Sequence, residues 1–220
     1  MKRSLSHGSI IVLAAVSLIL QSPRIAFSRD SATDPELNLL VYNYAALSSS
    51  QVTEIRARVA FIFEQAGIQT KWWDCRPVLE NHPAPATCQQ PLGPGNLAIR
   101  LLDQINISQA DYSHTALGLS YVSETGGSLA TLSCATIKRL ARGNRTSELA
   151  FQGHAIAHEI GHLLLGPGAH SNEGIMRALW NKSELQQIAA AQQGLLFPRK
   201  QAEQLRMSLS ARQGSPYASQ

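Results

Sequence analysis

Apolar residues recur at spacings of three and four in two long segments of the chain, which is the periodicity of an amphipathic helix. The first segment includes Val52, Ile55 and Val59. It follows a run of three serines, of which Ser50 is the favoured N-cap, and it closes at Gly67, a residue type common just after helices. The pattern therefore predicts a helix that begins at this serine run and ends at Gly67.

Several shorter runs are rich in β-branched, leucine and aromatic residues, and these predict strands. The predicted strands cover residues 37–47, 68–74, 96–102, 116–123 and 129–136. Because the first helix connects the first two strands, we expect a right-handed crossover and a parallel pair. The proline-rich residues 75–95 predict a surface loop, residues 103–115 an irregular polar segment, and residues 137–142 a short helical turn.

The second periodic segment predicts a helix over residues 147–165, which would end where Gly166 and Pro167 interrupt the pattern. Two shorter helices follow. A capping box that starts at Ser183 opens the first, which reaches about residue 193, and Pro198 opens the last.

Chemistry is concentrated in the second long helix, which carries the sequence His158-Glu159-Ile160-Gly161-His162. Two residues four apart on a helix differ by about 40° around the axis and about 6 Å along it, so both histidines can bind one metal ion. Glu159 is rotated by about 100°, which suits a general base better than a ligand. Beyond the helix end, His170 is placed to return as a third ligand, and three imidazoles with an open fourth position are typical of catalytic zinc.

This motif resembles that of the zincin metallopeptidases, and within them the metzincins, whose pattern is H-E-x-x-H-x-x-G-x-x-H followed by a methionine turn. Gly174-Ile175-Met176 is the corresponding candidate turn. The spacing differs from the family pattern, because Gly166 falls four residues after His162 rather than three, and His170 falls eight after it rather than six. The chain is similar to a small group of secreted bacterial zincins.

The resemblance implies an α+β fold: a mixed twisted sheet, an active-site helix and a small helical C-terminal subdomain. The sheet and helix part would cover residues 37–166 and the C-terminal part residues 167–220. In such proteins an edge strand above the active-site helix binds the peptide substrate by strand addition, and residues 116–123 are the candidate here.

The implied activity is hydrolysis of a peptide bond in a peptide or protein substrate. One catalytic zinc ion would be held by His158, His162 and His170, with Glu159 as general base. Alternatives stay open: a zinc hydrolase of non-peptide amides such as those of cell walls, or a catalytically silent zinc-binding module. Glu173 is an alternative third ligand.

Two roles near the motif are not decided by the sequence. His154 lies one turn before His158, as either a fourth ligand or a packed residue behind the ligands. No tyrosine follows Met176 until Tyr217, so no residue is assigned to stabilise the oxyanion.

The start of the chain has the features of a secretory signal peptide. Lys2 and Arg3 precede an apolar run at residues 10–20, and Ala26-Phe27-Ser28 supplies small residues for cleavage. We expect residues 1–28 to be removed, the alternative being a retained membrane anchor. Residues 29–220 would then form one domain, secreted or periplasmic and not inserted in a membrane. We expect a monomer.

Removal of residues 1–28 takes away three of the four net positive charges, because that segment contains Lys2, Arg3 and Arg24 and no acidic residue. No basic patch with interleaved aromatic residues occurs in the rest, so nothing indicates binding to nucleic acid.

The chain has three cysteines, and an exported protein can keep disulfides. Cys75 and Cys88 flank the proline-rich loop and are the natural pair. Cys134 would then be a free thiol, buried in a strand or, less simply, a group that covers the metal in a latent form.

Overall fold

A computed structural model describes residues 34–75, 83–105, 117–123, 126–143, 147–189 and 194–214. The predicted signal peptide, most of the polar segment 103–115 and the C-terminal residues 215–220 lie outside the described residues. None of the helices in the described ranges has the length and hydrophobicity that a membrane span requires.

Five strands, one short 3-10 helix and five α-helices make up the described part of the chain. In chain order they are β1 (Glu36–Asn43), α1 (Ser49–Gln65), β2 (Gln69–Asp74), η1 (Ala86–Gln89), β3 (Asn96–Leu102), β4 (Gly118–Ser123), β5 (Gly126–Ser133), α2 (Cys134–Gly143), α3 (Glu148–Leu165), α4 (Lys182–Ala189) and α5 (Arg199–Gln213).

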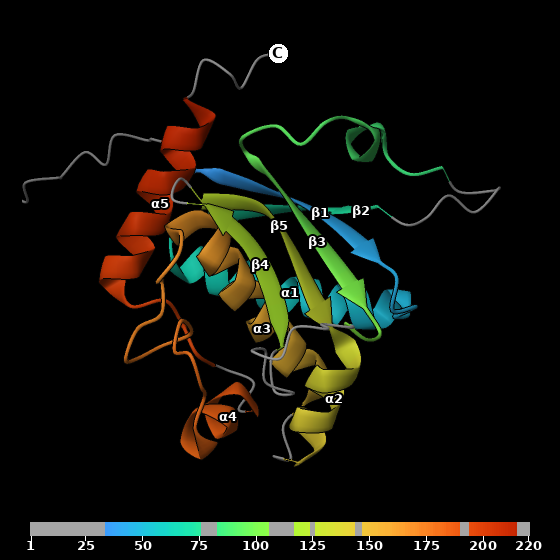
Figure 1. The fold of residues 1–220 in the computed structure, drawn as a ribbon, viewed down its shortest axis with the longest axis vertical. Coiled ribbons are helices and arrows are strands. Elements are labelled where there is room, and N and C mark those ends of the chain that lie inside the picture. The colour runs from blue at the N-terminus through green and yellow to red at the C-terminus, as the bar shows by residue number, and fades with distance from the viewer. Residues whose placement is uncertain are drawn as a thin grey trace, which may run out of the picture. The chain divides into compact units, whose positions relative to one another are not determined.

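The strands form one mixed sheet in the order β2-β1-β3-β5-β4 (Figure 1). The pairs β1–β2, β1–β3 and β3–β5 are parallel, whereas β4 runs antiparallel to β5 and lies at the edge. The predicted parallel pairing across the first crossover is thus confirmed, as is the prediction that the strand at residues 116–123, observed as β4, lies at the edge of the sheet.

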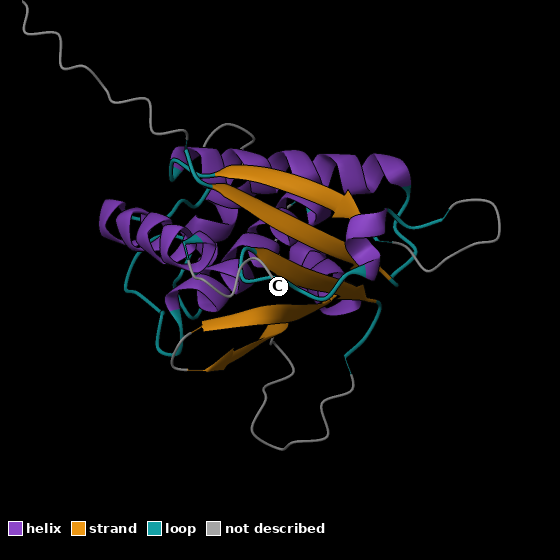
Figure 2. Cartoon of the chain, turned by 90° about the horizontal axis from the view of Figure 1, so that it is seen from above, coloured by secondary structure: helices purple, strands orange, loops and turns teal. Residues whose placement is uncertain are grey.

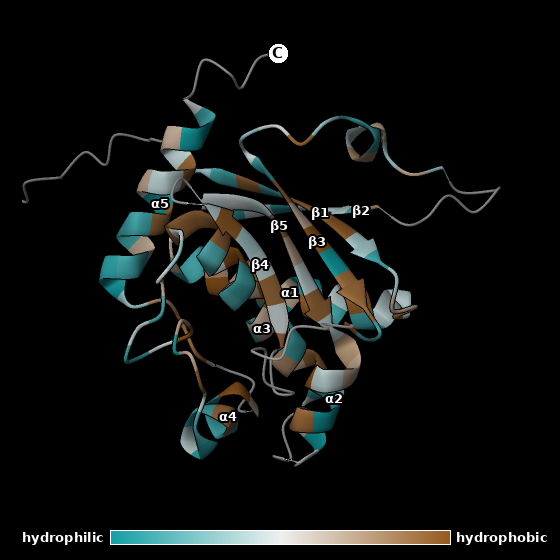
Figure 3. Ribbon diagram, viewed as in Figure 1, coloured by the Kyte–Doolittle hydropathy of each residue, from teal (hydrophilic) through white to brown (hydrophobic). Residues whose placement is uncertain are grey.

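Helices α1 and α3 lie side by side against one face of the sheet (Figures 1 and 2). β1 shows why: Leu37, Leu39 and Val41 lie two residues apart, so they share one face of the strand, and they belong to the same hydrophobic core as the buried residues of these helices. Hydrophobic residues accordingly gather on the central strands and along α3, while α5 is largely hydrophilic (Figure 3).

The first strand is shorter than predicted, because the side chain of Asn43 turns the chain out of the sheet. Its amide donates to the carbonyl of Leu47 at 2.8 Å and accepts from the Leu47 N–H at 3.1 Å. The N-cap of α1 also lies two residues earlier in the chain than predicted. Ser48, not Ser50, is the N-cap of α1, and it forms a capping box with Gln51.

A second boundary was wrong at residue 134, where the predicted strand 129–136 already becomes helix α2. The Ser133 hydroxyl accepts from the N–H of Thr136 at 3.3 Å and so caps the helix. Cys134 is therefore buried at the start of a helix rather than in a strand. Burial raises the pKa of its thiol to about 12, which makes it unreactive at neutral pH.

The capping box of α4 also begins earlier than predicted, at Asn181 instead of Ser183. The Asn181 side chain accepts from the N–H of Glu184 at 3.0 Å, and the Glu184 carboxylate accepts from the N–H of Asn181 at 2.7 Å. The polar run contained two candidate caps, and the reciprocal pair with an acidic residue at the third position is the one that forms.

α5 supports the ends of the two central helices with arginine side chains. Arg206 donates to the carbonyl of Ala66 at 2.6 Å, at the end of α1. Arg212 donates to the carbonyls of Leu163 in α3 and Gly127 in β5, each at 2.8 Å. Cationic groups stabilise helix C-termini because they pair with the carbonyls that lack helical partners. α5 thereby fixes α3, which carries the histidine motif.

The predicted disulfide between Cys75 and Cys88 is confirmed. It joins the end of β2 to η1 and closes the proline-rich segment, whose residues 76–82 lie outside the described part. Cys134 carries a free thiol, as predicted, and accepts a hydrogen bond from the amide of Gln152.

Candidate metal centre

Helix α3 is buried on nearly all sides and fixes two of the predicted ligands. Its N-cap is Ser147, and Glu148 lies in the first turn, where a negative charge is favourable. With the ends fixed by this cap and by Arg212, His158 and His162 project from the same face, as their four-residue spacing predicts.

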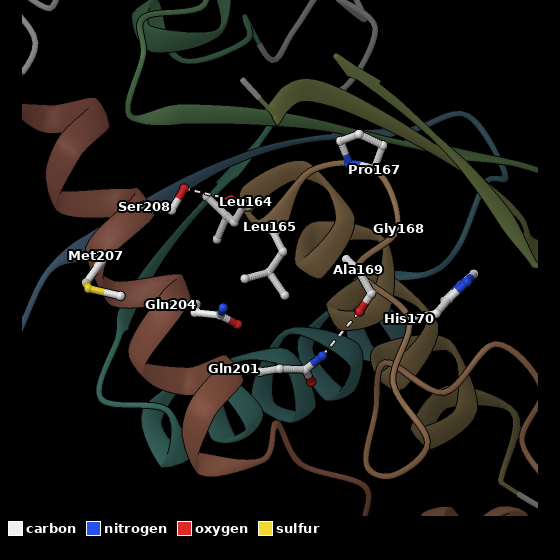
Figure 4. A pocket seen from close by; sticks show the side chains of 10 residues that line it. All are labelled: Leu164, Leu165, Pro167, Gly168, Ala169, His170, Gln201, Gln204, Met207 and Ser208. Carbon is white, nitrogen blue, oxygen red and sulfur yellow. Dashed lines mark hydrogen bonds between the residues drawn. The ribbon is translucent and has the colours of Figure 1, made fainter. Parts of the chain in front are cut away.

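His170 reaches these residues through a turn that glycine makes possible. Gly166 and Gly168 have φ values of +83° and +73°, in the left-handed region that favours glycine. α5 supports the same turn through a hydrogen bond: the side-chain amide of Gln201 donates to the carbonyl of Ala169 at 3.2 Å. A cavity of about 420 Å³ lies beside this contact. Figure 4 shows that the His170 ring points away from α5.

The three histidines converge through their Nε2 atoms. His162 Nε2 lies 3.1 Å from His158 Nε2 and 3.2 Å from His170 Nε2. Two nitrogens bound to one tetrahedral zinc ion at 2.0–2.1 Å lie about 3.3 Å apart, so these spacings fit a shared zinc ion. Among the described residues, the group able to share an ion contains these histidines and not Glu173, which is exposed. The geometry therefore favours His170 over Glu173.

The protonation of the imidazoles also suits a cation. His158 Nδ1 lies 2.8 Å from the carbonyl of Ile175 and donates to it, which leaves the Nε2 lone pair for a metal. Burial and, to a smaller extent, the neighbouring histidines lower the pKa values of His158 and His162 to about 4. Both rings are thus neutral at neutral pH, as metal ligands must be.

Met176 is fully buried under the centre, where its sulfur packs on Gly161 of the motif. A Cβ at Gly161 would collide with this sulfur, so the glycine is what allows the methionine turn to approach α3. Gly174, with φ of +69°, opens the turn. The candidate methionine turn therefore lies beneath the three histidines.

Trp180 is a neighbour that the sequence analysis did not identify. Its indole N–H donates to the carbonyl of Ile175 at 3.1 Å, and its ring lies edge-on to His158 with centroids 5.8 Å apart. The carbonyl that orients His158 is thus itself held by Trp180. The sequence shows only that a tryptophan follows the methionine turn, and the acceptor of its N–H is set by the tertiary packing of that turn on α3.

His154 does not join the metal group. Its side chain is fully buried, with Nδ1 2.7 Å from the carbonyl of Ala150 and Nε2 accepting from the N–H of Leu195 at 3.2 Å. Of the two roles that the sequence left open, the structure supports the packed residue. His154 ties the segment before α5 to α3.

Glu159 lies beside the histidines with its side chain buried. Burial raises the pKa of this carboxyl to about 7, against the opposing effect of a hydrogen bond from Ser120. Ser120, on the edge strand β4, is a second neighbour that the sequence analysis missed. The serine is 39 residues away, and no local pattern connects the two.

These groups line an open cavity of about 890 Å³. The edge strand β4 forms one wall and the residues after the methionine turn, with Trp180, form another. Leu140, Phe151 and Leu185 supply an apolar end. The cavity thus brings together a candidate metal centre, a carboxyl group and an apolar surface, which is the usual composition of a small-molecule or substrate site.

A mixed sheet with an antiparallel edge strand over a histidine-bearing helix defines the zincin type of fold. The structure is similar to the crystal structure of archaemetzincin from Methanopyrus kandleri, with a TM-score of 0.53 and 16% sequence identity. The match covers 80% of this chain and 96% of the other. The predicted zincin-like fold is therefore confirmed.

The sequence itself matches no model of a known protein family, and a search of the curated proteins found no match.

Proposed function

We propose that this chain is a zinc-dependent metallopeptidase. The observation that carries the proposal is the convergence of three imidazole nitrogens, 3.1 and 3.2 Å apart, next to a buried carboxyl group in an open cavity. His158, His162 and His170 would hold the ion. A zinc ion bound there lowers the pKa of a bound water to about 7 and polarises a substrate carbonyl.

Glu159 is the general base in this proposal. A carboxyl with a pKa near 7 can accept a proton from the attacking water and pass it to the leaving amine at neutral pH. Its position on α3, one residue after His158, keeps it from being a ligand while it remains beside the ligands.

The substrate is a peptide or protein segment that adds to β4 as a further strand. β4 pairs with β5 along one side, and within the described part of the chain no strand pairs with its other side. Main-chain hydrogen bonds at such an edge would hold an extended peptide along the cavity. The apolar end at Leu140 and Phe151 would take an apolar side chain of the substrate.

The proposal includes export of the protein. Residues 1–28 would be a cleaved signal peptide and residues 29–220 a single, monomeric catalytic domain that is secreted or periplasmic. The disulfide between Cys75 and Cys88 supports this placement, because disulfides persist in oxidising compartments.

The test is cleavage of a mixed peptide library by residues 29–220, with zinc content measured in the same samples. Glu159→Ala removes the proposed base, and Glu148→Ala, at a half-buried glutamate in the first turn of the same helix, is the matched control. We expect cleavage by the wild type and Glu148→Ala only, abolished by a chelator. If all three proteins bind zinc and none cleaves peptides, the peptidase proposal is wrong, and amides outside peptides become the substrates to test.

A further inference from the structure

The side chain of Glu159 lies against two residues of the edge strand β4, Gly118 and Ser120. Ser120 Oγ lies 2.5 Å from Glu159 Oε2 and 3.0 Å from the backbone oxygen of Glu159. A serine hydroxyl has one hydrogen to donate, and a carboxylate is a stronger acceptor than a peptide carbonyl. The shorter contact is therefore the hydrogen bond that determines where this carboxylate lies.

Gly118 makes the close approach of the strand possible. A Cβ at this position would lie 2.9 Å from Glu159 Cγ and 2.9 Å from the carbonyl oxygen of Thr131. Any larger residue would push the glutamate side chain away from β4 or the strand away from β5. Gly118 and Ser120 lie two residues apart, so they share the strand face that is directed at α3.

The two carboxylate oxygens of Glu159 have different surroundings. Oε2 accepts from Ser120, whereas no described residue donates to Oε1. Glu159 lines the cavity described above. One oxygen is thus bound to the protein and the other is left for a molecule in the cavity.

We propose that Ser120 is a positioning residue that holds Oε2 of Glu159 on β4 and thereby directs Oε1 to the attacking water. This inference rests on the proposed function, since it assigns a role in the same site. It adds a consequence: the strand that would bind the peptide is also the strand that orients the base. A substrate that pairs correctly with β4 is therefore presented to a base fixed by the same backbone.

The kinetic test compares Ser120→Ala, Ser120→Thr and Ser208→Ala. Ser208 lies on α5 and does not line the cavity of Glu159, and its hydroxyl donates to the carbonyl of Leu164 in α3 at 2.6 Å. Its substitution therefore removes another hydrogen bond from a serine to α3. We expect Ser120→Ala to lower kcat by about tenfold to a hundredfold, as for other residues that orient groups around a metal. Ser120→Thr keeps the hydroxyl and should restore most of kcat, and Ser208→Ala should leave kcat unchanged.

Three further measurements separate positioning from a merely structural role. KM for the peptide, the zinc dissociation constant and the melting temperature should stay close to those of the wild type in Ser120→Ala. If the variant keeps its kcat, or if zinc affinity and melting temperature fall together with kcat, Ser120 does not act as a positioning residue.

Infrared spectroscopy tests the contact without any turnover. Difference spectra of the metal-free protein against Glu159→Gln, at alkaline pH, isolate the carboxylate band of Glu159. The band should shift in Ser120→Ala and keep its position in Ser120→Thr and Ser208→Ala. An unshifted band in Ser120→Ala refutes the proposal. If the wild type cleaves no peptide, the proposed function fails, while the infrared result still decides whether Ser120 holds this carboxylate.

Discussion

Replacement of His170 by alanine is the most direct perturbation of the candidate metal centre. His170 comes from a turn, is exposed and lies 3.2 Å from His162 through the two Nε2 atoms. Exposed substitutions usually change the free energy of unfolding by less than about 0.5 kcal/mol, so the metal-free variant should fold as the wild type does. Any large effect of the substitution should therefore appear only when zinc is present.

The size of that effect follows from the number of ligands. Structural zinc sites with four protein ligands bind with about 10–16 kcal/mol, or roughly 2.5–4 kcal/mol for each ligand. Loss of one of three histidines should then weaken zinc binding by about a hundredfold or more. At a zinc concentration of about 100 times the wild-type Kd, bound zinc adds about 2.7 kcal/mol to the wild-type unfolding free energy and about 0.4 kcal/mol to that of the variant.

The difference of about 2.3 kcal/mol corresponds to a melting temperature roughly 5–9 °C lower for His170→Ala with zinc present. The assay is a thermal melt with and without zinc, together with chelator competition for Kd. Glu173→Ala is the matched control, because Glu173 is the rival third ligand and is also exposed. Wild-type zinc affinity in His170→Ala, with loss of affinity in Glu173→Ala, would refute the assignment of His170.

Three other predictions concern the support of the site. Arg212→Met should lower the unfolding free energy by about 2–4 kcal/mol in urea titrations, because two charge-assisted hydrogen bonds to helix and strand carbonyls are lost. The control Arg199→Met breaks an exposed ion pair in the same helix and should lower the unfolding free energy by less than about 0.5 kcal/mol. Gly161→Ala should destabilise by about 1–3 kcal/mol through overpacking against the methionine turn, whereas Gly143→Ala, where a Cβ meets nothing within 4 Å, should not destabilise. Burial lowers the pKa of His154 to about 4. The unfolded chain therefore binds more protons than the folded one between about pH 6.5 and pH 4, and the unfolding free energy must fall as the pH falls through this range. His154→Gln in metal-free protein should weaken that pH dependence, and an unchanged dependence by urea unfolding at pH 7 and pH 5 would contradict the assignment.

The sequence predicted the existence of the elements better than their ends. Hydrophobic periodicity identified the long helices and the strands because burial against one face is a property of each segment taken alone. The boundaries depended on single side-chain contacts. Asn43 bonds back to the main chain at Leu47, and Ser133 caps a helix where the residue composition indicated a strand. Several polar residues near each boundary could form such a cap, and the pattern does not rank them.

The residues of the site show the same difference between local and tertiary determinants. His158, Glu159 and His162 were predictable because the period of a helix fixes their relative directions. Ser120 and Trp180 were not, because each acts through a tertiary contact whose partner is set by the packing of β4 or the methionine turn on α3. Residues that carry a motif are local in sequence. Residues that orient them come from whatever element the fold brings close, and their identity follows only from the structure.

The unusual spacing of the motif has a physical explanation in the turn that follows α3. The helix continues to Leu165, and the N–H of Gly166 still bonds to the carbonyl of His162. One additional helical residue rotates the point of exit by about 100°, so a turn of the family length would send the third histidine in the wrong direction. Two left-handed glycines, at 166 and 168, and the hydrogen bond from Gln201 to Ala169 redirect the chain and bring His170 back to His162. Metal binding therefore requires the third imidazole to lie at a given position in space. The number of residues between the helix and this histidine can change where glycines and a supporting helix redirect the chain.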